Sequence, residues 1–504
     1  MTDPLLLAID VGTTVLKVIL FRPDGSSARV AQRATPLSSP RQGWVEMDMD
    51  GLWRLVADTT REVSRGYADR IATIAICGFS SGLFLVDADG RPVRPGIVWN
   101  DSRCASLIES WHRSGTMDRI FEISGSAIYP GFSLPLLNWI QSHEPASIAR
   151  SAHFLACKDW LRLCLTDTVA TDQTDASYFP YDVHARNHSR ALLDLCGIGG
   201  LERLLPPIAE SGALAGTLTT TAAERLGLAP EIPVVVGMCD FSSATYATGA
   251  VRPGQACTAL GTACLNNLIM DSPASNPFGV GLTGATLDGR WLRTLSNTAG
   301  TVNIDWFANT FYGGASAQVI NQITVDASSI PIGADGITYL PYISTAGVSA
   351  PFVHPHARGQ FFGISSEHRR PQFARAVFEG VALSIRDAYE AMPVGVEEIR
   401  LVGGGAGNEF WCQMIADCTG RTVLVPNVTY ASGWGVARLA AEFICADTDD
   451  QRNSAACTVR RYESDRRRTA AYVEVFALYK EISAAGVELW TRRARTFEKI
   501  LDIG

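Results

Sequence analysis

The chain has 504 residues, enough for two or three domains that each bury a core. It carries 43 Lys and Arg against 51 Asp and Glu without a long basic run, which argues against nucleic acid as a partner. It also lacks a stretch of about 18 uncharged apolar residues, so we expect no membrane span. Its start does not have a signal-peptide layout, and its 12 cysteines, such as Cys77, Cys164 and Cys445, form no C-x-x-C pair. We therefore expect a cytoplasmic protein with buried, reduced thiols and no zinc site.

The first patterned stretch is Leu5–Phe21, in which two apolar runs flank a short Gly-containing segment. This pattern predicts a β-hairpin. At its tip, Gly12 lets the backbone approach a ligand closely. The hydroxyls of Thr13 and Thr14 can donate to phosphate oxygens, and Asp10 can hold Mg²⁺ through water. An ordinary turn with Asp and Thr in their usual positions explains the same residues, so both interpretations stay open here.

Further along the first half of the chain, two predicted strands end in polar side chains. Residues 71–77 form a β-branched, apolar run that predicts a buried strand, and it ends at Ser80 and Ser81. Trp99 and Asp101 lie just after another apolar edge. In α/β proteins, such strand ends carry the ligand-binding groups. Helices are predicted over 49–66, 102–111 and 134–141, a strand-to-helix passage over 154–161, and a polar loop over 172–177.

A further informative segment is Ile232–Asp240. Its β-branched run ends at Gly237, and Asp240 follows just before a small-residue helix predicted over 242–248. A carboxylate at the end of a strand and the start of a helix can be a simple N-cap. The same position suits a general base that faces a cleft.

The hairpin pattern returns in the second half. Ala256–Met270 is again apolar, then Gly261-Thr262, then apolar. Two hairpins with a Gly-Thr tip, one in each half, indicate two similar domains that face each other across a nucleotide. We place these domains at residues 1–248 and 249–504.

Two later segments complete the pattern. A long helix is predicted over 371–392, where Pro371 suits the first turn and Gly380 indicates the close approach of another backbone. A strand then runs into the glycine-rich turn Gly403–Asn408 and a helix over 409–418. Such glycines let a flat ring or ribose lie against bare backbone, although a flexible loop is the alternative. Because the chain has neither a G-x-G-x-x-G fingerprint in a first βαβ unit nor a G-x-x-x-x-G-K-[ST] loop, ATP would be bound in another way.

Taken together, these motifs resemble the FGGY carbohydrate kinases of the hexokinase–actin–Hsp70 superfamily, nearly end to end and in the family's order. The most specific match is Gly359-x-Phe361-x-Gly363-Ile364, seven residues, and then Gln372-Phe373-x-x-Ala376-Val377-Phe378-Glu379. The other matching motifs are DVGTTVLK (10–17), GWVEMD (43–48), GFSSG (78–82), WNDSR (99–103), KDWLRLCLT (158–166), TDQTDAS (171–177), GMCD (237–240), ALGT (259–262) and GGGAGNEFW (403–411).

The resemblance implies an α/β fold with two ribonuclease H-like domains and an active-site cleft between them. It implies ATP-dependent phosphorylation of a small sugar, with Asp240 as general base and Asp10 as the carboxylate that organises Mg²⁺. It assigns the nucleotide to Thr13, Thr14, Lys17, Gly261, Thr262, Gly404, Gly405, Ala406 and Asn408. It assigns the sugar to Ser80, Ser81, Trp99, Asp101 and Asp240. Homodimers are common in this family.

The substrate is the point at which the chain departs from its relatives. Xylulose-type members have GQMHG where this chain has Gly78–Gly82, and the Arg-Glu pair of glycerol-type members is missing. Trp99-x-Asp101-x-Arg103 and Thr171-Asp172 are most similar to pentulose kinases, which favours a ketopentose such as xylulose and a 5-phosphate product. The alternatives are a sugar-alcohol kinase acting on a compound such as erythritol, a catalytically silent sugar sensor, and an actin-like ATPase. The presence of both Asp10 and Asp240 argues against the sensor.

Overall fold

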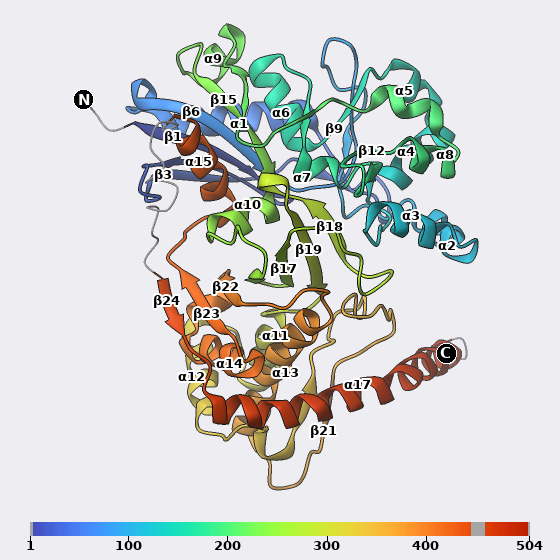
Figure 1. The fold of residues 1–504 in the computed structure, drawn as a ribbon, viewed down its shortest axis with the longest axis vertical. Helices are drawn as coiled ribbons and strands as arrows, with labels where there is room; N and C mark the ends of the chain where they lie inside the picture. Colours follow the sequence, from blue (N-terminus) through green and yellow to red (C-terminus); the bar gives the residue numbers. More distant parts are fainter. Residues whose placement is uncertain (1–3, 445–458, 502–504) are drawn as a thin grey trace.

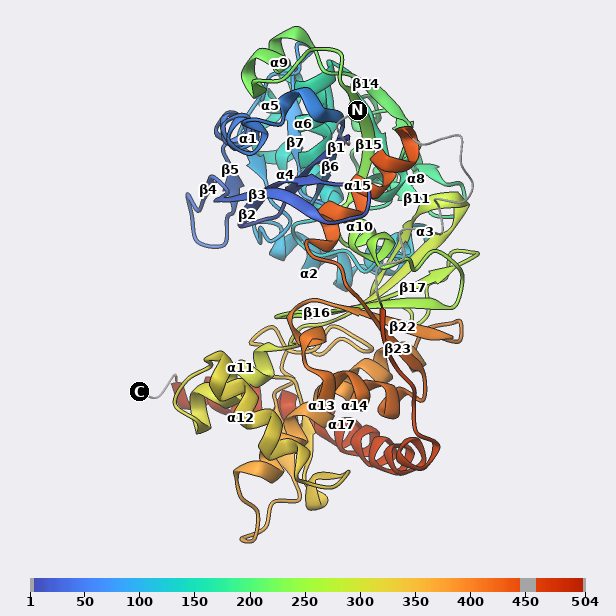
Figure 2. The same ribbon diagram turned by 90° about the vertical axis from the view of Figure 1, so that its left-hand side faces the viewer.

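The computed structural model describes residues 4–444 and 459–501. Two lobes lie one above the other, each built around a mixed β-sheet with helices against it (Figures 1 and 2). The described helices of the first half are α1 (Met49–Ser64), α2 (Ala105–Arg113), α3 (Thr116–Ser124), α4 (Ser133–His143), α5 (Pro145–Arg150), α6 (Cys157–Thr166), α7 (Gln173–Ala176), α8 (Arg190–Leu195), α9 (Thr220–Leu226) and α10 (Asp240–Ala247). Those of the second half are α11 (Val302–Phe311), α12 (Ala317–Ser328), α13 (Arg370–Glu390), α14 (Glu409–Thr419), α15 (Ala431–Ile444) and α17 (Arg466–Leu501).

The first sheet has the strand order β14-β15-β6-β1-β2-β3. β1 pairs with β2 in the predicted hairpin, and it runs parallel to β6, which in turn runs parallel to β15. Every residue of β1 is buried, which explains its unbroken apolar sequence. Because three parallel strands end at the same edge, the residues that follow them lie close together. The strands are β1 (Leu5–Val11), β2 (Val15–Phe21), β3 (Ser27–Ala34), β6 (Ile71–Gly78), β14 (Leu214–Thr217) and β15 (Pro233–Cys239).

The second sheet repeats this arrangement, with the strand order β18-β19-β17-β16-β22-β23-β24. β16 forms an antiparallel hairpin with β17 and runs parallel to β22, which runs parallel to β23. Both lobes therefore contain a hairpin followed by two parallel strands, and the predicted two-domain α/β fold is confirmed. The strands are β16 (Gln255–Leu260), β17 (Cys264–Met270), β18 (Leu282–Ala285), β19 (Trp291–Asn297), β22 (Glu398–Val402), β23 (Thr422–Pro426) and β24 (Val459–Tyr462).

Short strands outside the two sheets line the connections between the larger elements. They are β4 (Leu37–Ser38), β5 (Glu46–Met47), β7 (Phe84–Val86), β8 (Gly96–Ile97), β9 (His153–Leu155), β10 (Thr171–Asp172), β11 (Tyr181–Asp182), β12 (Asn187–His188), β13 (Ile208–Ala209), β20 (Thr338–Leu340) and β21 (Gln360–Phe362).

Helix α13 is the central helix of the second lobe. Pro371 lies in its first turn, as predicted, and most of the following residues are buried. A Cβ added to Gly380 would lie 2.5 Å from the carbonyl oxygen of Tyr339, so the predicted close approach of another backbone is confirmed. The nearby α17 begins with Arg466, Arg467 and Arg468, which are all exposed.

Helix α15 crosses back to the first lobe, although it belongs to the second half of the chain (Figure 1). It packs against β1, β6 and α10. Trp434 and Ala437 are buried there beside Leu6 and Ile19. A Cβ on Gly435 would lie 2.1 Å from the carbonyl oxygen of Ser243, so the helix sits directly on the α10 backbone. The division of the chain at residue 249 stays a prediction. Helix α15 follows that boundary in the sequence but packs on the first lobe.

Residues 172–177 differ from the prediction of a polar loop. They form the end of β10 and the short helix α7, and five of these six residues are buried. Their polar side chains are held by one another and by Lys158, which the sequence pattern does not reveal. Cys77 is a buried free thiol and Cys164 a partly buried one, whereas Cys445 lies outside the described residues. Among the described helices, none has the length and apolar character needed to cross a membrane.

Candidate active site

Two carboxylates meet at the shared end of the parallel strands. Asp10 is buried near the end of β1, and Asp240 directly follows β15. The Lys17 ammonium lies 3.2 Å from Oδ2 of Asp10, across the hairpin. Burial and the nearby Asp10 carboxylate raise the pKa of Asp240 to about 7. Two acids and one cation are thus gathered at one edge of the first sheet.

The simple N-cap interpretation of Asp240 is wrong. The N-cap of α10 is Cys239, and its side chain makes no capping hydrogen bond. Asp240 is the first helical residue, and its Oδ1 accepts a hydrogen bond from the neighbouring Phe241 N–H at 2.7 Å. The carboxylate is therefore oriented by local backbone and is not consumed in capping.

The tips of the two hairpins are similar. A Cβ on Gly12 would lie 2.8 Å from the carbonyl oxygen of Val15, so the first turn requires glycine. Thr14 and Thr262 are exposed at the two tips. The second tip is held against the start of α11, because the N–H of Thr301 donates to the Gly261 carbonyl at 2.7 Å. Each tip thus presents an exposed threonine on a turn whose backbone is held by hydrogen bonds.

The predicted sugar residues Ser80, Ser81 and Trp99 lie beside these carboxylates. Ser80 is buried, and its hydroxyl has no hydrogen-bond partner within the described parts of the chain. Ser81 adopts a left-handed backbone with φ of 67°, which follows from the sharp turn after β6. Trp99 is 38% exposed, and its Nε1–H donates to Oγ1 of Thr13 at 2.7 Å. This bond joins the predicted sugar site to the first hairpin tip.

Tyr129 is a further member of the site that sequence reasoning missed. Its ring packs edge-on against Trp99, with centroids 6.2 Å apart. Burial raises the pKa of Tyr129, a hydrogen bond with Ser81 opposes this rise, and the Asp240 carboxylate adds to it. Tyr129 therefore lies within reach of both residues. It belongs to the segment between α3 and α4, where no periodic pattern marks it.

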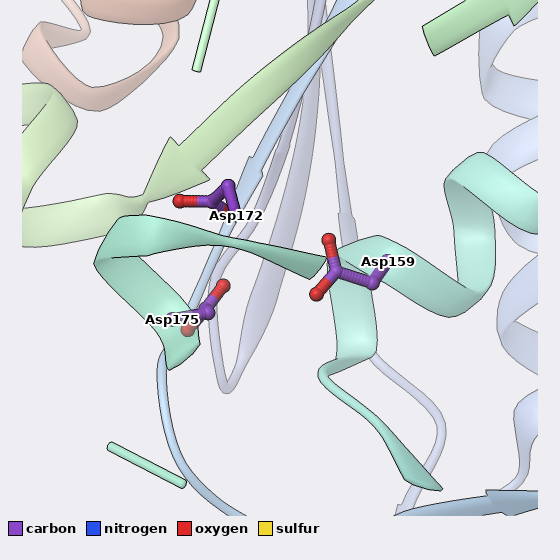
Figure 3. A group of neighbouring side chains, drawn as sticks. All are labelled: Asp159, Asp172 and Asp175. Atoms are coloured by element: carbon purple, nitrogen blue, oxygen red, sulfur yellow. The ribbon is translucent and has the colours of Figure 1, made fainter. Parts of the chain in front are cut away.

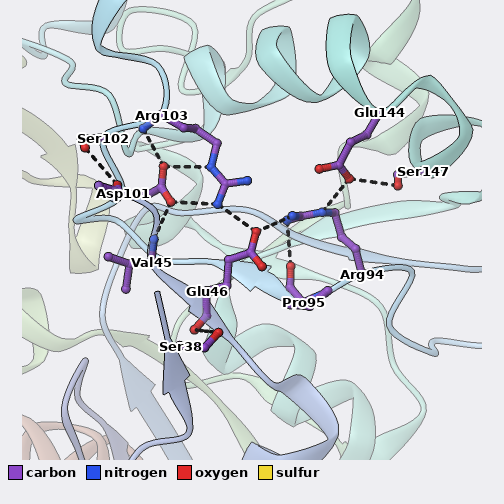
Figure 4. A network of polar contacts seen from close by, with 11 residues as sticks. Ser38, Val45, Glu46, Arg94, Pro95, Asp101, Ser102, Arg103, Glu144 and Ser147 are labelled. Carbon is purple, nitrogen blue, oxygen red and sulfur yellow. Dashed lines mark hydrogen bonds and ion pairs between the residues drawn. The ribbon is translucent and has the colours of Figure 1, made fainter. Parts of the chain in front are cut away.

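Asp101 has a different role from the one expected. Its side chain is fully buried, and its two oxygens accept hydrogen bonds from the Val45 N–H at 2.7 Å and from the backbone and guanidinium of Arg103 at 2.8–2.9 Å (Figure 4). Arg103 continues to Glu46 at 2.9 Å, and Glu46 also pairs with Arg94. The expected sugar contact of Asp101 is thus corrected, because its oxygens are already engaged. Asp101 instead fixes the loop that carries Trp99.

Asp159, Asp172 and Asp175 form a buried cluster (Figure 3). The Lys158 ammonium is 2.7 Å from Asp159 and 2.9 Å from Asp175, and it also contacts Asp172. Burial alone would lower the pKa of Lys158, but the three carboxylates raise it well above its usual value. The ammonium therefore fills the place that a metal ion would take between these acids.

This cluster is connected to the end of β15. Asp172 accepts hydrogen bonds from the N–H of Thr174 at 2.8 Å and from its hydroxyl. The Thr174 hydroxyl in turn accepts a hydrogen bond from the Cys239 N–H at 2.8 Å. Because Cys239 directly precedes Asp240, the cluster holds the backbone from which the candidate base projects.

On the other lobe, a pocket of about 480 Å³ lies at the ends of β22 and β23. A Cβ on Gly403 would lie 2.7 Å from the carbonyl oxygen of Leu260, so the pocket begins directly beside the second hairpin tip. The described residues that line it are Leu401, Val402, Gly403, Ala406, Gly407, Val425, Pro426, Asn427, Val428 and Arg460.

The glycine-rich turn contributes to this pocket only in part. Gly403, Ala406 and Gly407 line it, whereas Gly404, Gly405 and Asn408 are not among the described lining residues. Asn408 caps α14 by accepting from the Trp411 N–H at 3.1 Å, and its amide donates to Thr324 at 2.8 Å. Sequence reasoning missed the lining residues after β23 and on β24, since neither segment carries a recognisable motif.

The chain matches two family models over most of its length. They are described as the FGGY family of carbohydrate kinases, N-terminal domain, over residues 5–247 and C-terminal domain over residues 256–442. The xylulose kinase of Escherichia coli (strain K12) is 30% identical over 447 residues, which cover 86% of this chain and 89% of that protein. The L-xylulose/3-keto-L-gulonate kinase of the same organism is 26% identical over 446 residues, covering 86% and 87%.

Solved structures share the fold. A ligand-bound xylulose kinase from Lactobacillus acidophilus has a TM-score of 0.90 at 21% identity and covers 97% of this chain and 99% of its own. The xylulose kinase from Rhodospirillum rubrum has a TM-score of 0.87 at 25% identity, covering 97% and 100%. From the two family models and the identity to a curated relative, the chain belongs to the FGGY family of carbohydrate kinases.

Proposed function

We propose that the protein transfers the γ-phosphoryl group of ATP to the 5-hydroxyl of a ketopentose, xylulose. The observation that carries this proposal is the position of Asp240, beside Asp10 at the end of the parallel strands and next to Ser81 and Tyr129. Similar proteins named xylulose kinase or L-xylulose kinase support the choice of sugar. The juxtaposed Asp10 and Asp240 favour turnover over a silent sensor, because a sensor has no need of a base.

The pocket beside Gly403 fits the nucleoside part of ATP. Its volume of about 480 Å³ lies within the usual range for a small-ligand site, roughly 300–1,000 Å³. Glycine backbone at Gly403 and Gly407 gives flat walls against which a ring can lie. The neighbouring tip at Gly261 and Thr262 can then receive the phosphates, with Thr13, Thr14 and Lys17 facing them from the first lobe.

Asp10 fits a role in holding Mg²⁺. Its oxygens are hard donors, which this ion prefers, and the Lys17 ammonium donates to Oδ2. When bound, Mg²⁺ supplies charge neutralisation at the phosphate oxygens. We therefore assign Asp10 to this ion, through water or directly, and keep Asp240 for the sugar.

The reaction then needs few chemical steps from the protein. Asp240 accepts the proton of the sugar hydroxyl as that oxygen forms a bond to the γ-phosphorus, and the bond from phosphorus to the bridging oxygen breaks to release ADP. Phosphoryl transfer depends mainly on positioning and charge neutralisation, so a base that orients the hydroxyl is sufficient. Trp99 and Tyr129 form an aromatic wall for the sugar, and the Trp99–Thr13 bond fixes this wall relative to the phosphate site.

The proposal is tested by a coupled ADP-release assay of the purified protein with Mg·ATP. D-xylulose, L-xylulose, D-ribulose, L-ribulose, erythritol, D-arabinitol and glycerol are compared, with a no-sugar reaction as control. We expect strong sugar-dependent ADP release with one of the two xyluloses. ADP release with a polyol alone would indicate that the protein is a sugar-alcohol kinase. A protein that binds ATP yet releases no ADP above the control with any of these compounds would contradict the proposal.

A further inference from the structure

The pocket on the second lobe has one wall that lies outside the matched family region. The family model ends at residue 442, whereas Arg460 on β24 lines the pocket. We propose that the guanidinium of Arg460 is the surface on which the purine base of the nucleotide stacks. This inference rests on the proposed function, since it assumes that the pocket receives the nucleoside.

The sheet register places Arg460 on the pocket side. β24 pairs antiparallel with β23, and Arg460 is the cross-strand partner of Val425, which also lines the pocket. Cross-strand partners share one face of a sheet. The next residue, Arg461, is paired with Leu424, and neither of them is among the described lining residues. Alternation along the strand thus separates two adjacent arginines between opposite faces.

The guanidinium of Arg460 is held flat by two bonds. Nη2 donates to the carbonyl oxygen of Ala406 at 3.2 Å, and Nη1 donates to Oε1 of Glu409 at 3.2 Å. The side chain therefore reaches from the edge strand to the glycine-rich turn while remaining 45% exposed. Its edge is used by these bonds and its planar face is left uncovered by them. A fixed, weakly hydrated guanidinium plane is well suited to stacking on an aromatic ring.

Strand order gives the direction in which a nucleotide would lie. The pocket lies across the strand order β22-β23-β24, with Gly403 at the end of β22, against Leu260 of β16, and Arg460 on β24. Two strand spacings separate Gly403 from Arg460, which is about 10 Å. The phosphates belong at the β16 end, beside Gly261 and Thr262, so the base belongs at the β24 end. Of the described lining residues, Arg460 alone carries a charge, and Glu409 balances it.

The test compares ADP with pyrophosphate, which has two linked phosphates but neither the ribose nor the base. Binding of each to the full-length protein with Mg²⁺ is measured by isothermal titration calorimetry for the wild type, Arg460→Ala and Arg461→Ala. We expect Arg460→Ala to weaken ADP binding about tenfold and to leave pyrophosphate binding within twofold. Arg461→Ala is the matched control, since it removes the same charge from the other face, and both affinities should stay unchanged.

A second variant separates stacking from a folding defect. Glu409→Gln keeps Arg460 but weakens its tether, so ADP binding should fall by a smaller factor and pyrophosphate binding should not change. Equal weakening of ADP and pyrophosphate in Arg460→Ala would make Arg460 a phosphate ligand and overturn the proposal. Unchanged ADP binding would also overturn it. A failure of the proposed function would give a different result: the wild-type protein would bind ADP but would phosphorylate no sugar.

Discussion

Asp175 illustrates how a single buried residue is held in an unusual protonation state. The cluster around it contains three carboxylates, Asp159, Asp172 and Asp175, against the cations of Lys158 and Arg162. Burial raises the pKa of Asp175 to about 8, assisted by the other two carboxylates and opposed by Lys158. At neutral pH we therefore expect Asp175 to be protonated, which leaves the cluster without net charge.

This protonation predicts a specific dependence of stability on pH. The pKa of Asp175 is higher in the folded protein than in the unfolded chain, so its contribution is present at low pH and is lost as the pH rises through the folded value. Asn cannot titrate, and we expect Asp175→Asn to flatten the decline of Tm between about pH 4 and 8, the interval between the unfolded and folded pKa values. Differential scanning calorimetry measures this, with the exposed Asp58→Asn as control. Parallel Tm profiles for the wild type and Asp175→Asn would show that Asp175 is ionised throughout.

Asp101 shows why a residue's role cannot be read from its motif alone. The Trp99-x-Asp101-x-Arg103 spacing marks a strand end, and the prediction that Trp99 and Asp101 both face the sugar follows from that position. The structure separates them, because Asp101 is turned inward to Arg103 and the Val45 backbone. Arg103 belongs to the same motif, but Val45 lies 56 residues away in the sequence, and no local pattern shows that the Asp101 side chain turns toward both.

At the scale of elements, Asn408 joins the glycine-rich turn to α14. The resemblance assigned it to the adenosine site, whereas its side chain caps the helix and bonds Thr324. Loss of a cap costs about 1 kcal/mol, which lowers Tm by roughly 2–4 °C for a domain of this size. We expect Asn408→Ala to show this loss with the KM for ATP within about twofold, because the side chain lies off the pocket.

Asn408→Ser serves as the matched control, since serine retains the capping oxygen and should keep most of the stability. Thermal unfolding and steady-state kinetics are measured on both variants. A large rise in the KM for ATP at unchanged Tm would contradict the capping role. It would indicate that Asn408 contacts the nucleotide.

The apolar pattern of the sequence predicts those elements whose residues are buried in a regular way. The hairpins β1–β2 and β16–β17 are predictable because continuous apolar runs flank a Gly-containing turn, and helix α13 because its apolar residues recur at helical spacing. The short helix α7 was missed because its residues are polar and their partners come from α6. The edge strand β24 has the sequence Val-Arg-Arg-Tyr, whose two adjacent arginines hide the alternation. The sequence also carries no signal that α15 returns to the first lobe.

For the whole molecule, the proposed function requires two similar lobes to supply different parts of one site. The first lobe supplies Asp10, Asp240 and the aromatic wall, and the second supplies the pocket beside Gly403. β15 joins β6 across more than 150 residues of intervening chain, so the meeting of Asp10 and Asp240 follows from topology and not from spacing. The resemblance predicted this pairing, and the sheet explains it.

The central claim is that Asp240 accepts the proton of the sugar hydroxyl. Its most direct test is the sugar-dependent rate of ADP release by Asp240→Asn, with Mg·ATP and the sugar that gives the highest wild-type activity. Asn keeps the size of the side chain and removes the base, so we predict a fall in kcat of about 10²–10⁴-fold. ADP affinity, measured alongside, should not change, because the nucleotide pocket lies on the other lobe. An Asp240→Asn protein with wild-type kcat would contradict the account.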